Sequence, residues 1–220
     1  MSRIIPVTLN KLSMAEAFLF YRDELKLHVY PVYGPWSKED CPGKKSAVTK
    51  WWDYDPYNCN LAKFFGDNGK CHNIGCAPKN HLIVVDLDSK EDKGESVRKF
   101  LTDNPDCAKG PWHETNGGAH LVFICPDLPK FWRPDGKKPL YGPLKAEVGP
   151  GVNGELFYSD HTNVVFPPSI HVQGSVYRWV TFGEVPEVSW KWLQDVFKFS
   201  FGGRTEEPKE KHMRRTPSGI

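Results

Sequence analysis

A run of consecutive apolar residues, Leu82-Ile83-Val84-Val85, leads directly into the triplet Asp86-Leu87-Asp88. Four successive apolar side chains are typical of a strand that is buried on both faces, in the centre of a sheet. Side chains of a strand alternate between its faces, so both aspartates leave the same face, with α-carbons roughly 6.5–7 Å apart. The segment therefore predicts a central strand that ends in two carboxylates.

Two carboxylates on one face of a strand can bind divalent cations. Hard oxygen ligands favour Mg²⁺ or Mn²⁺ over Zn²⁺. Two such ions can assist an in-line displacement at a triphosphate, one beside the attacking oxygen and one beside the leaving group. Acidic pairs also occur where a strand gives way to a helix cap, so the Asp86/Asp88 pair alone leaves both interpretations open.

Hydrophobic periodicity and turn residues predict helices and strands in mixed order around this segment. Ser13, with Glu16 three residues later, forms a capping-box pattern at the start of the first helix. We expect helices at 12–27, 60–66, 89–101 and 188–199, strands at 28–35, 73–78, 81–88 and 175–182, a turn and strand within 113–126, and a hairpin formed by 154–159 and 163–169. Residues 126–154, rich in Pro, Gly and Lys, are predicted to be irregular.

Composition indicates a water-soluble globular chain. The 220 residues are 39% hydrophobic and 25% charged, with a formal net charge of +2. This charge permits nucleic-acid binding without arguing for it. No apolar run approaches the roughly eighteen residues of a membrane helix, and the N-terminus lacks the apolar region of a signal peptide, so we expect a cytoplasmic protein without a membrane partner. Residues 1–201 are predicted to form one domain. Residues 202–220 are predicted to be a disordered tail or linker.

Two further motifs carry polar groups at strand ends. In Thr115-Asn116-Gly117-Gly118-Ala119-His120, the glycine pair permits close approach of a backbone or a phosphate, and His120 enters the next strand. Pro167-Pro168 cannot donate to a ladder, so we expect it to end a strand and to leave Ser169 and His171 on an exposed, rigid loop. A hairpin turn with a core histidine, and an ordinary structural turn, are the alternatives.

Six cysteines are scattered without a CxxC pair, so we expect thiols. Cys71, His72 and Cys76 would be the ligands of a structural zinc, but the usual paired spacing is missing. Lys50 directly precedes Trp51 and Trp52, an interleaving suited to stacking on a base. Burial of one tryptophan beside an exposed neighbour is the alternative.

Taken together, the ordered motifs resemble a family. A strand ending in DLD, a TNGGAH turn, an acidic residue, then PPSIH and GSVYRW follow the order found in primase-polymerase (Prim-Pol) domains of the archaeo-eukaryotic primase superfamily. The resemblance covers about residues 14–180 and is nearest to replication proteins of archaeal plasmids and to phage primases. It implies an α+β fold, with an RRM-like mixed-sheet catalytic subdomain fused to a smaller α/β subdomain and the active site in the cleft between them.

The resemblance also implies a set of site residues. Asp86 and Asp88 take the first two metal-binding places, and Glu155 is preferred over Glu147 for the third. Nucleotide contacts are expected from His120, Ser169 and His171, with Lys45 and Lys50 as further candidates. The implied cofactors are Mg²⁺ or Mn²⁺, and the implied partners are dNTP or NTP substrates, a single-stranded DNA template and a helicase domain or protein.

The resulting hypothesis is a DNA primase/polymerase that transfers nucleotides to a 3′-hydroxyl during plasmid, phage or mobile-element replication. One alternative is a DxD-type glycosyltransferase, which would leave PPSIH unexplained. The other is a non-catalytic DNA-binding replication module, which would have no need of negative charge beside a phosphate polymer.

Overall fold

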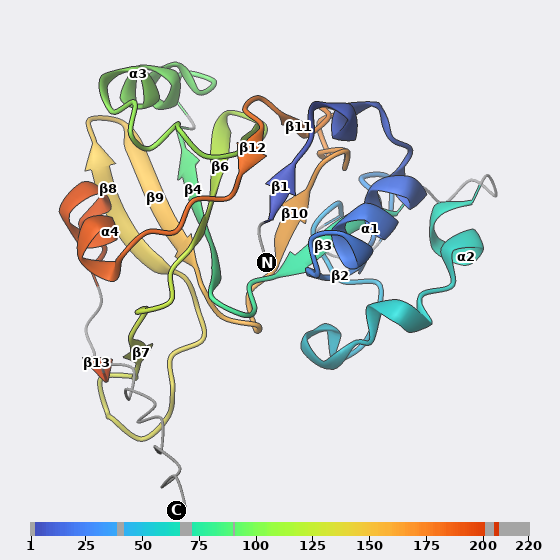
Figure 1. Ribbon diagram of the computed structural model, residues 1–220, viewed down its shortest axis with the longest axis horizontal. Helices are drawn as coiled ribbons and strands as arrows, with labels where there is room; N and C mark the ends of the chain where they lie inside the picture. Colours follow the sequence, from blue (N-terminus) through green and yellow to red (C-terminus); the bar gives the residue numbers. More distant parts are fainter. Residues whose placement is uncertain (1–2, 39–41, 67–71, 90, 201–204, 207–220) are drawn as a thin grey trace, which may run out of the picture.

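The protein combines two antiparallel sheets with a few short helices in a mixed α+β fold, seen in a computed structural model that describes residues 3–38, 42–66, 72–89, 91–200 and 205–206 (Figure 1). The α+β class predicted from the sequence is confirmed. Within the described part of the chain, no helix is long and apolar enough to cross a membrane.

The larger sheet has six strands and contains the aspartate strand near its centre. Every ladder in it is antiparallel, so the prediction of a mixed sheet was wrong for this part of the fold. In spatial order its strands are β11 (Arg178–Trp179), β5 (Trp112–Glu114), β6 (Gly118–Ile124), β4 (Leu82–Asp88), β9 (Val152–Phe157) and β8 (Leu144–Gly149).

The smaller sheet lies beside the larger one and has three strands (Figure 1). Its order is β10 (Val164–Phe166), β3 (Asn73–Ala77) and β2 (His28–Val32). Two short pairs complete the strands, β1 (Ile4–Ile5) with β12 (Gly183–Glu184) and β7 (Lys130–Phe131) with β13 (Thr205–Glu206).

The first helix begins at the cap expected from the sequence, and the structure adds the caps of the others. Ser13 caps α1 (Met14–Asp23) in a reciprocal capping box with Glu16, and Ser189 caps α4 (Trp190–Phe197). The other α-helices are α2 (Leu61–Phe65) and α3 (Glu95–Asp103), and the 3₁₀ turns are η1 (Val7–Lys11), η2 (Trp51–Asp53) and η3 (Pro56–Asn58). Helix α3 begins later than predicted, because the Asp92 carboxylate accepts hydrogen bonds from the amides of Gly94, Glu95 and Ser96.

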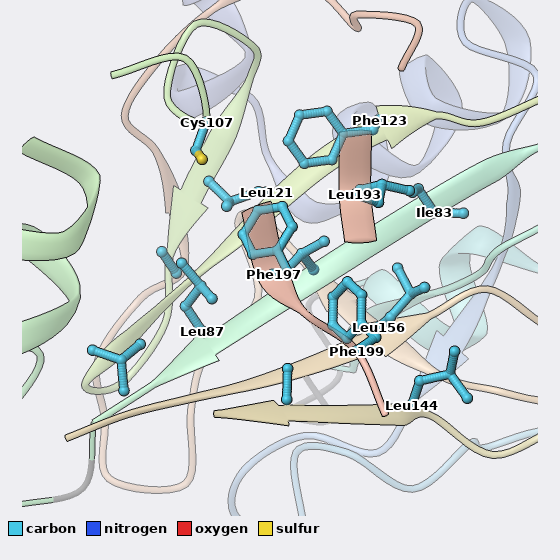
Figure 2. Close-up of a cluster of buried hydrophobic side chains, with 14 of the residues drawn as sticks. Ile83, Leu87, Cys107, Leu121, Phe123, Leu144, Leu156, Leu193, Phe197 and Phe199 are labelled. Carbon is cyan, nitrogen blue, oxygen red and sulfur yellow. The ribbon is translucent and has the colours of Figure 1, made fainter. Parts of the chain in front are cut away.

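Strand β4 separates two hydrophobic cores. Ile83, Val85 and Leu87 belong to the core beneath α3 and α4. Figure 2 shows Ile83 and Leu87 in this core together with Leu193 and Phe197. Leu82 and Val84 point the other way, into the core shared with α1 and the smaller sheet. The burial on both faces predicted for this strand is confirmed, and the alternation continues so that Asp86 and Asp88 lie on the second face.

The structure corrects two assignments in the middle of the chain. Segments 154–159 and 163–169 do not form a hairpin, because β9 pairs with β4 and β8 while β10 pairs with β3 in the other sheet. A hydrogen-bonded turn, in which Thr162 bonds to the Ser159 carbonyl, lies between them. The segment 126–154 is also less irregular than predicted, since it contains all of β8.

The C-terminal segment predicted to be disordered is described only at Thr205–Glu206. These two residues pair with Lys130–Phe131 in the short β13–β7 ladder. The remaining residues of that segment lie outside the described part of the chain.

Candidate active site

A cleft of about 850 Å³ opens where the two sheets meet. Its floor is the acidic end of β4 with the facing residues of β6 and β9, and its walls come from the smaller sheet and from loops. The lining residues are Lys44, Asp86, Asp88, Ser89, Lys93, Thr115, Asn116, Gly117, His120, Glu155, Phe157, Asn163, Val164, Val165, His171, Gln173 and Tyr177.

Three carboxylates lie on the cleft floor. Glu155 of β9 stands directly opposite Asp86 of β4 in the antiparallel register, and Asp88 is two residues further along the same face. The side chains of Asp86 and Glu155 are 26% and 37% exposed, so solvent and ligands can reach both. Asp86, Asp88 and Glu155, chosen from the sequence, are thus brought to one cleft.

The competing third acid, Glu147, occupies a different place. It lies on the edge strand β8, opposite Asn153, and β8 is separated from β4 by β9. Glu155 is therefore the direct cross-strand neighbour of Asp86, and Glu147 is not.

His120 borders the other side of Asp86. It is opposite Asp86 in the β4–β6 register, is 8% exposed, and its Nε2 lies 3.4 Å from Asp86 Oδ1. Its Nδ1 is buried and has no hydrogen-bond partner among the described residues. Asp86 is thus flanked by an imidazole on one neighbouring strand and a carboxylate on the other.

The glycine pair before His120 is required by backbone geometry. Gly117 has φ +95°, a conformation that side chains disfavour. At Gly118 a Cβ would lie 2.1 Å from the Leu87 carbonyl oxygen, far inside van der Waals contact. The pair therefore lets β6 approach β4 at the point where Asp88 leaves the strand.

The loop after β10 contributes one of its two predicted residues to the cleft. Strand β10 ends at Phe166, as the following prolines predict. Ser169 is fully buried, contrary to the expected exposure, because its Oγ accepts a hydrogen bond from the Ile74 amide. It anchors the loop to β3, while His171 lines the cleft.

Nε2 of His171 is suited to donate a hydrogen bond. Burial, and then the nearby Lys44 ammonium, lower the pKa of His171, which favours the neutral ring. Its Nδ1 accepts a hydrogen bond from the Gln173 amide, so the neutral ring carries its proton on Nε2. Tyr177 is also a donor, since burial and then the Asp86 carboxylate raise its pKa well above the ordinary value.

The lysines of the cleft differ from those chosen by sequence reasoning. Lys44 and Lys93 line it, whereas Lys45 and Lys50 are not among its lining residues. The GKK segment indicated a basic loop but could not show which lysine points inward. Lys93 was missed because nothing in the sequence marks the left-handed backbone (φ +54°) at this position.

The acidic floor fits a divalent metal in its donor chemistry. All three side chains offer carboxylate oxygens, the ligands that Mg²⁺ and Mn²⁺ prefer. In the described part of the chain no three His, Cys, Asp or Glu side chains are already gathered closely enough to hold an ion. Glu155 instead approaches the Lys145 ammonium at 3.8 Å, and Asp86 approaches His120.

The candidate zinc ligands and the two tryptophans have ordinary structural contacts where the structure describes them. Cys76 is a fully buried thiol in β3, and the His72 ring bonds to the Phe64 carbonyl, while Cys71 lies outside the described residues. Trp51 stacks on Tyr30 with ring centroids 5.2 Å apart, and Trp52 contacts the ring of His161. Both tryptophans are half-buried and contact rings of the protein itself.

An α+β fold with a carboxylate floor and basic and imidazole groups on its walls defines a site suited to a phosphate-bearing ligand. The sequence matches the Prim-Pol family, described as bifunctional DNA primase/polymerase, N-terminal, over residues 19–190. The chain belongs to this family, and the resemblance found in its motifs is confirmed. No curated protein matches the chain significantly.

Membership indicates DNA primase/polymerase activity, with a DNA template and nucleotides as substrates. It disfavours the glycosyltransferase alternative. The matched range contains every residue chosen from the sequence for the site, from Lys45 to His171.

Proposed function

We propose that this chain is the catalytic domain of a primase/polymerase that joins nucleoside triphosphates to a 3′-hydroxyl on a single-stranded DNA template, with two divalent ions held by Asp86, Asp88 and Glu155. Its setting would be the replication of a plasmid, phage or other mobile element. The six-stranded sheet would be the RRM-like catalytic half, and the three-stranded sheet with α1 the smaller half.

The direct opposition of Asp86 and Glu155 carries the proposal. Cβ atoms of opposite residues in an antiparallel pair are only about 4.5–5.5 Å apart, and like charges there are destabilising. Asp88 adds a third carboxylate to the same face. Such an arrangement is unfavourable for folding alone and becomes favourable when cations and a triphosphate share the cleft.

Each side chain has a role that follows from its position. Bound Mg²⁺ or Mn²⁺ would neutralise the triphosphate and promote ionisation of the 3′-hydroxyl. Asp86, Asp88 and Glu155 would hold the ions and orient the reacting atoms. His120 and His171 would donate to phosphate oxygens, and Lys44 would add positive charge beside His171. Catalysis would rest on positioning and charge neutralisation.

Isosteric substitution tests the assignment. D86N and D88N should each lower nucleotide incorporation about a thousandfold, since ion-mediated charge stabilisation contributes several kcal/mol. The control is D103N on α3, where Asp103 is exposed and pairs with Lys99 outside the cleft. The assay compares primer extension and primer-free synthesis on single-stranded DNA, with each nucleotide type and with Mg²⁺ or Mn²⁺.

Removal and return of metal complete the test. EDTA should abolish incorporation by the parent, and added Mg²⁺ or Mn²⁺ should restore it. Full activity of D86N or D88N, in a protein with the parent's circular dichroism spectrum, would contradict the two-metal assignment. DNA binding without incorporation by the parent, under every condition, would favour the non-catalytic module instead.

A further inference from the structure

His113 is a fully buried histidine in β5, immediately behind the cleft. It stands opposite His120 in the β5–β6 register and opposite Trp179 in the β11–β5 register. A single cross-strand row therefore runs from Trp179 through His113 and His120 to Asp86 and Glu155. His113 and Trp179 are the two members of this row that do not line the cleft.

The polar atoms of His113 have no evident structural purpose. Its exposure is 0%, and neither ring nitrogen makes a well-aligned hydrogen bond with any residue that the structure describes; the Glu114 backbone offers only a poorly aligned polar contact. Buried polar groups are nearly always paired, and an unpaired one is destabilising. An apolar residue of similar volume would suit this position better if stability alone determined it.

Burial also keeps the ring neutral. It lowers the pKa of His113 well below the ordinary value, the proximity of His120 lowers it further, and the backbone of Glu114 opposes the shift. A neutral ring adds no charge behind the cleft, and any effect it has on the site must come from packing.

Aromatic rings surround His113 and hold it in one orientation. His120, Trp179, Phe166 and Tyr177 all meet it at steep angles, with centroids 4.7, 4.9, 5.4 and 6.0 Å away. Edge-to-face contacts of this kind are favourable and directional. Trp179 is fixed in turn, because its Nε1 donates to the Tyr21 hydroxyl, which donates to the Pro167 carbonyl.

His120 depends on this packing for its own orientation. A functional imidazole is usually oriented by a hydrogen bond at the nitrogen remote from its ligand. The corresponding nitrogen of His120, Nδ1, has no such partner among the described residues. Instead, the His120 ring lies against the rings of His113 and Tyr177, at interplanar angles of 77° and 39°.

We propose that His113 is a positioning residue, whose ring edge holds the His120 imidazole with Nε2 directed toward Asp86 and the incoming triphosphate. The inference rests on the phosphate-binding role proposed for His120. His113 would thus act without touching the substrate. Its position is one where an apolar side chain would make the fold more stable.

The decisive variant is H113L, with H113F as a second. Leucine removes both unpaired nitrogens and the ring edge, so H113L should melt at or above the temperature of the parent. Its kcat/KM for the nucleotide should nevertheless fall about tenfold, since small misplacements of a binding group can lower rates up to a hundredfold. H113F keeps a ring against His120 and should retain more activity than H113L.

Two further measurements distinguish positioning from a general defect. The His120 ring proton signals should shift or broaden in H113L when observed by NMR, and affinity for single-stranded DNA should stay at the parent's value. H28L is the matched control, because His28 is a partly buried histidine that bonds to the Trp51 carbonyl outside the cleft. It should leave the His120 signals and kcat/KM unchanged.

Three outcomes would overturn the inference. These are an H113L protein that fails to fold or melts below the parent, one with unchanged kcat/KM, and one with unchanged His120 signals. H120A and D86N are measured alongside. If both of these remain active, the proposed function fails; if they lose activity while H113L keeps it, only the role of His113 fails.

Discussion

Glu155 lies directly opposite Asp86 across the β9–β4 ladder, with its carboxylate on the same face of the sheet. Two residues that face each other in this way share one environment, although 69 positions separate them in the chain. Neutralising one of the two carboxylates would stabilise the sheet, because it removes the repulsion between them. The same change would weaken cation binding, because it removes a negatively charged ligand.

Replacing Glu155 with glutamine should therefore stabilise the protein while inactivating it. We expect E155Q to raise the free energy of unfolding by at most about 0.5 kcal/mol in metal-free buffer, the scale of a like-charge cross-strand pair, because the exposed contact with Lys145 that is lost offsets part of the gain. Incorporation should fall at least about a hundredfold. E147Q is the comparison, since position 147 is opposite Asn153 in the register of the edge strand β8 and not opposite Asp86. Urea denaturation and primer extension measure both effects, and a more severe loss in E147Q would reverse the choice of third ligand.

The adjacent residues Lys44 and Lys45 allow a matched test of which lysine binds the triphosphate. Lys44 lines the cleft and Lys45 does not. A charged hydrogen bond contributes about 1.5–3 kcal/mol, so K44Q should raise the KM for the nucleotide about tenfold or more. K45Q should change it less than about twofold. Steady-state kinetics with saturating primed template measure the difference, and equal effects would remove Lys44 from the nucleotide site.

Among the glycines of the described strands, Gly118 is the one where an added Cβ would lie nearest to another atom. A Cβ there would lie 2.1 Å from the Leu87 carbonyl, between the two aspartates, so G118A should lower the free energy of unfolding by about 2–3 kcal/mol. At Gly142 a Cβ meets nothing within 4 Å, and G142A should stay within about 0.5 kcal/mol of the parent. Thermal and urea unfolding provide the test. An equally stable G118A would mean that β4 and β6 can separate without loss.

His113 should make stability depend on pH. Its pKa is lowered in the folded protein, so between that value and about 6.5 the unfolded chain binds more protons, and stability falls as the pH falls. One such group changes the free energy of unfolding by at most about 1.4 kcal/mol per pH unit. Urea denaturation at pH 7, 6 and 5 should therefore show a shallower decline for H113L than for the parent. His28 and His171, whose pKa values are also lowered, remain in both proteins. Parallel declines would show that His113 is not the group responsible.

The sequence by itself determined the local features of this protein. Alternation along β4 placed Asp86 and Asp88 on one face, because side-chain direction in a strand depends only on position. Ser13 and Ser189 fixed two helix starts through their own side chains. The ordered motifs indicated the family, and the match over residues 19–190 confirmed it.

Only the tertiary structure decided which residues meet. Strand register is set by packing between segments far apart in the chain, and a shift of one residue would turn each side chain to the other face. For this reason the sequence could propose both Glu155 and Glu147, but the β9–β4 register brings Glu155 opposite Asp86. The same dependence on distant partners buried Ser169, turned Lys44 into the cleft, and placed His113 behind His120.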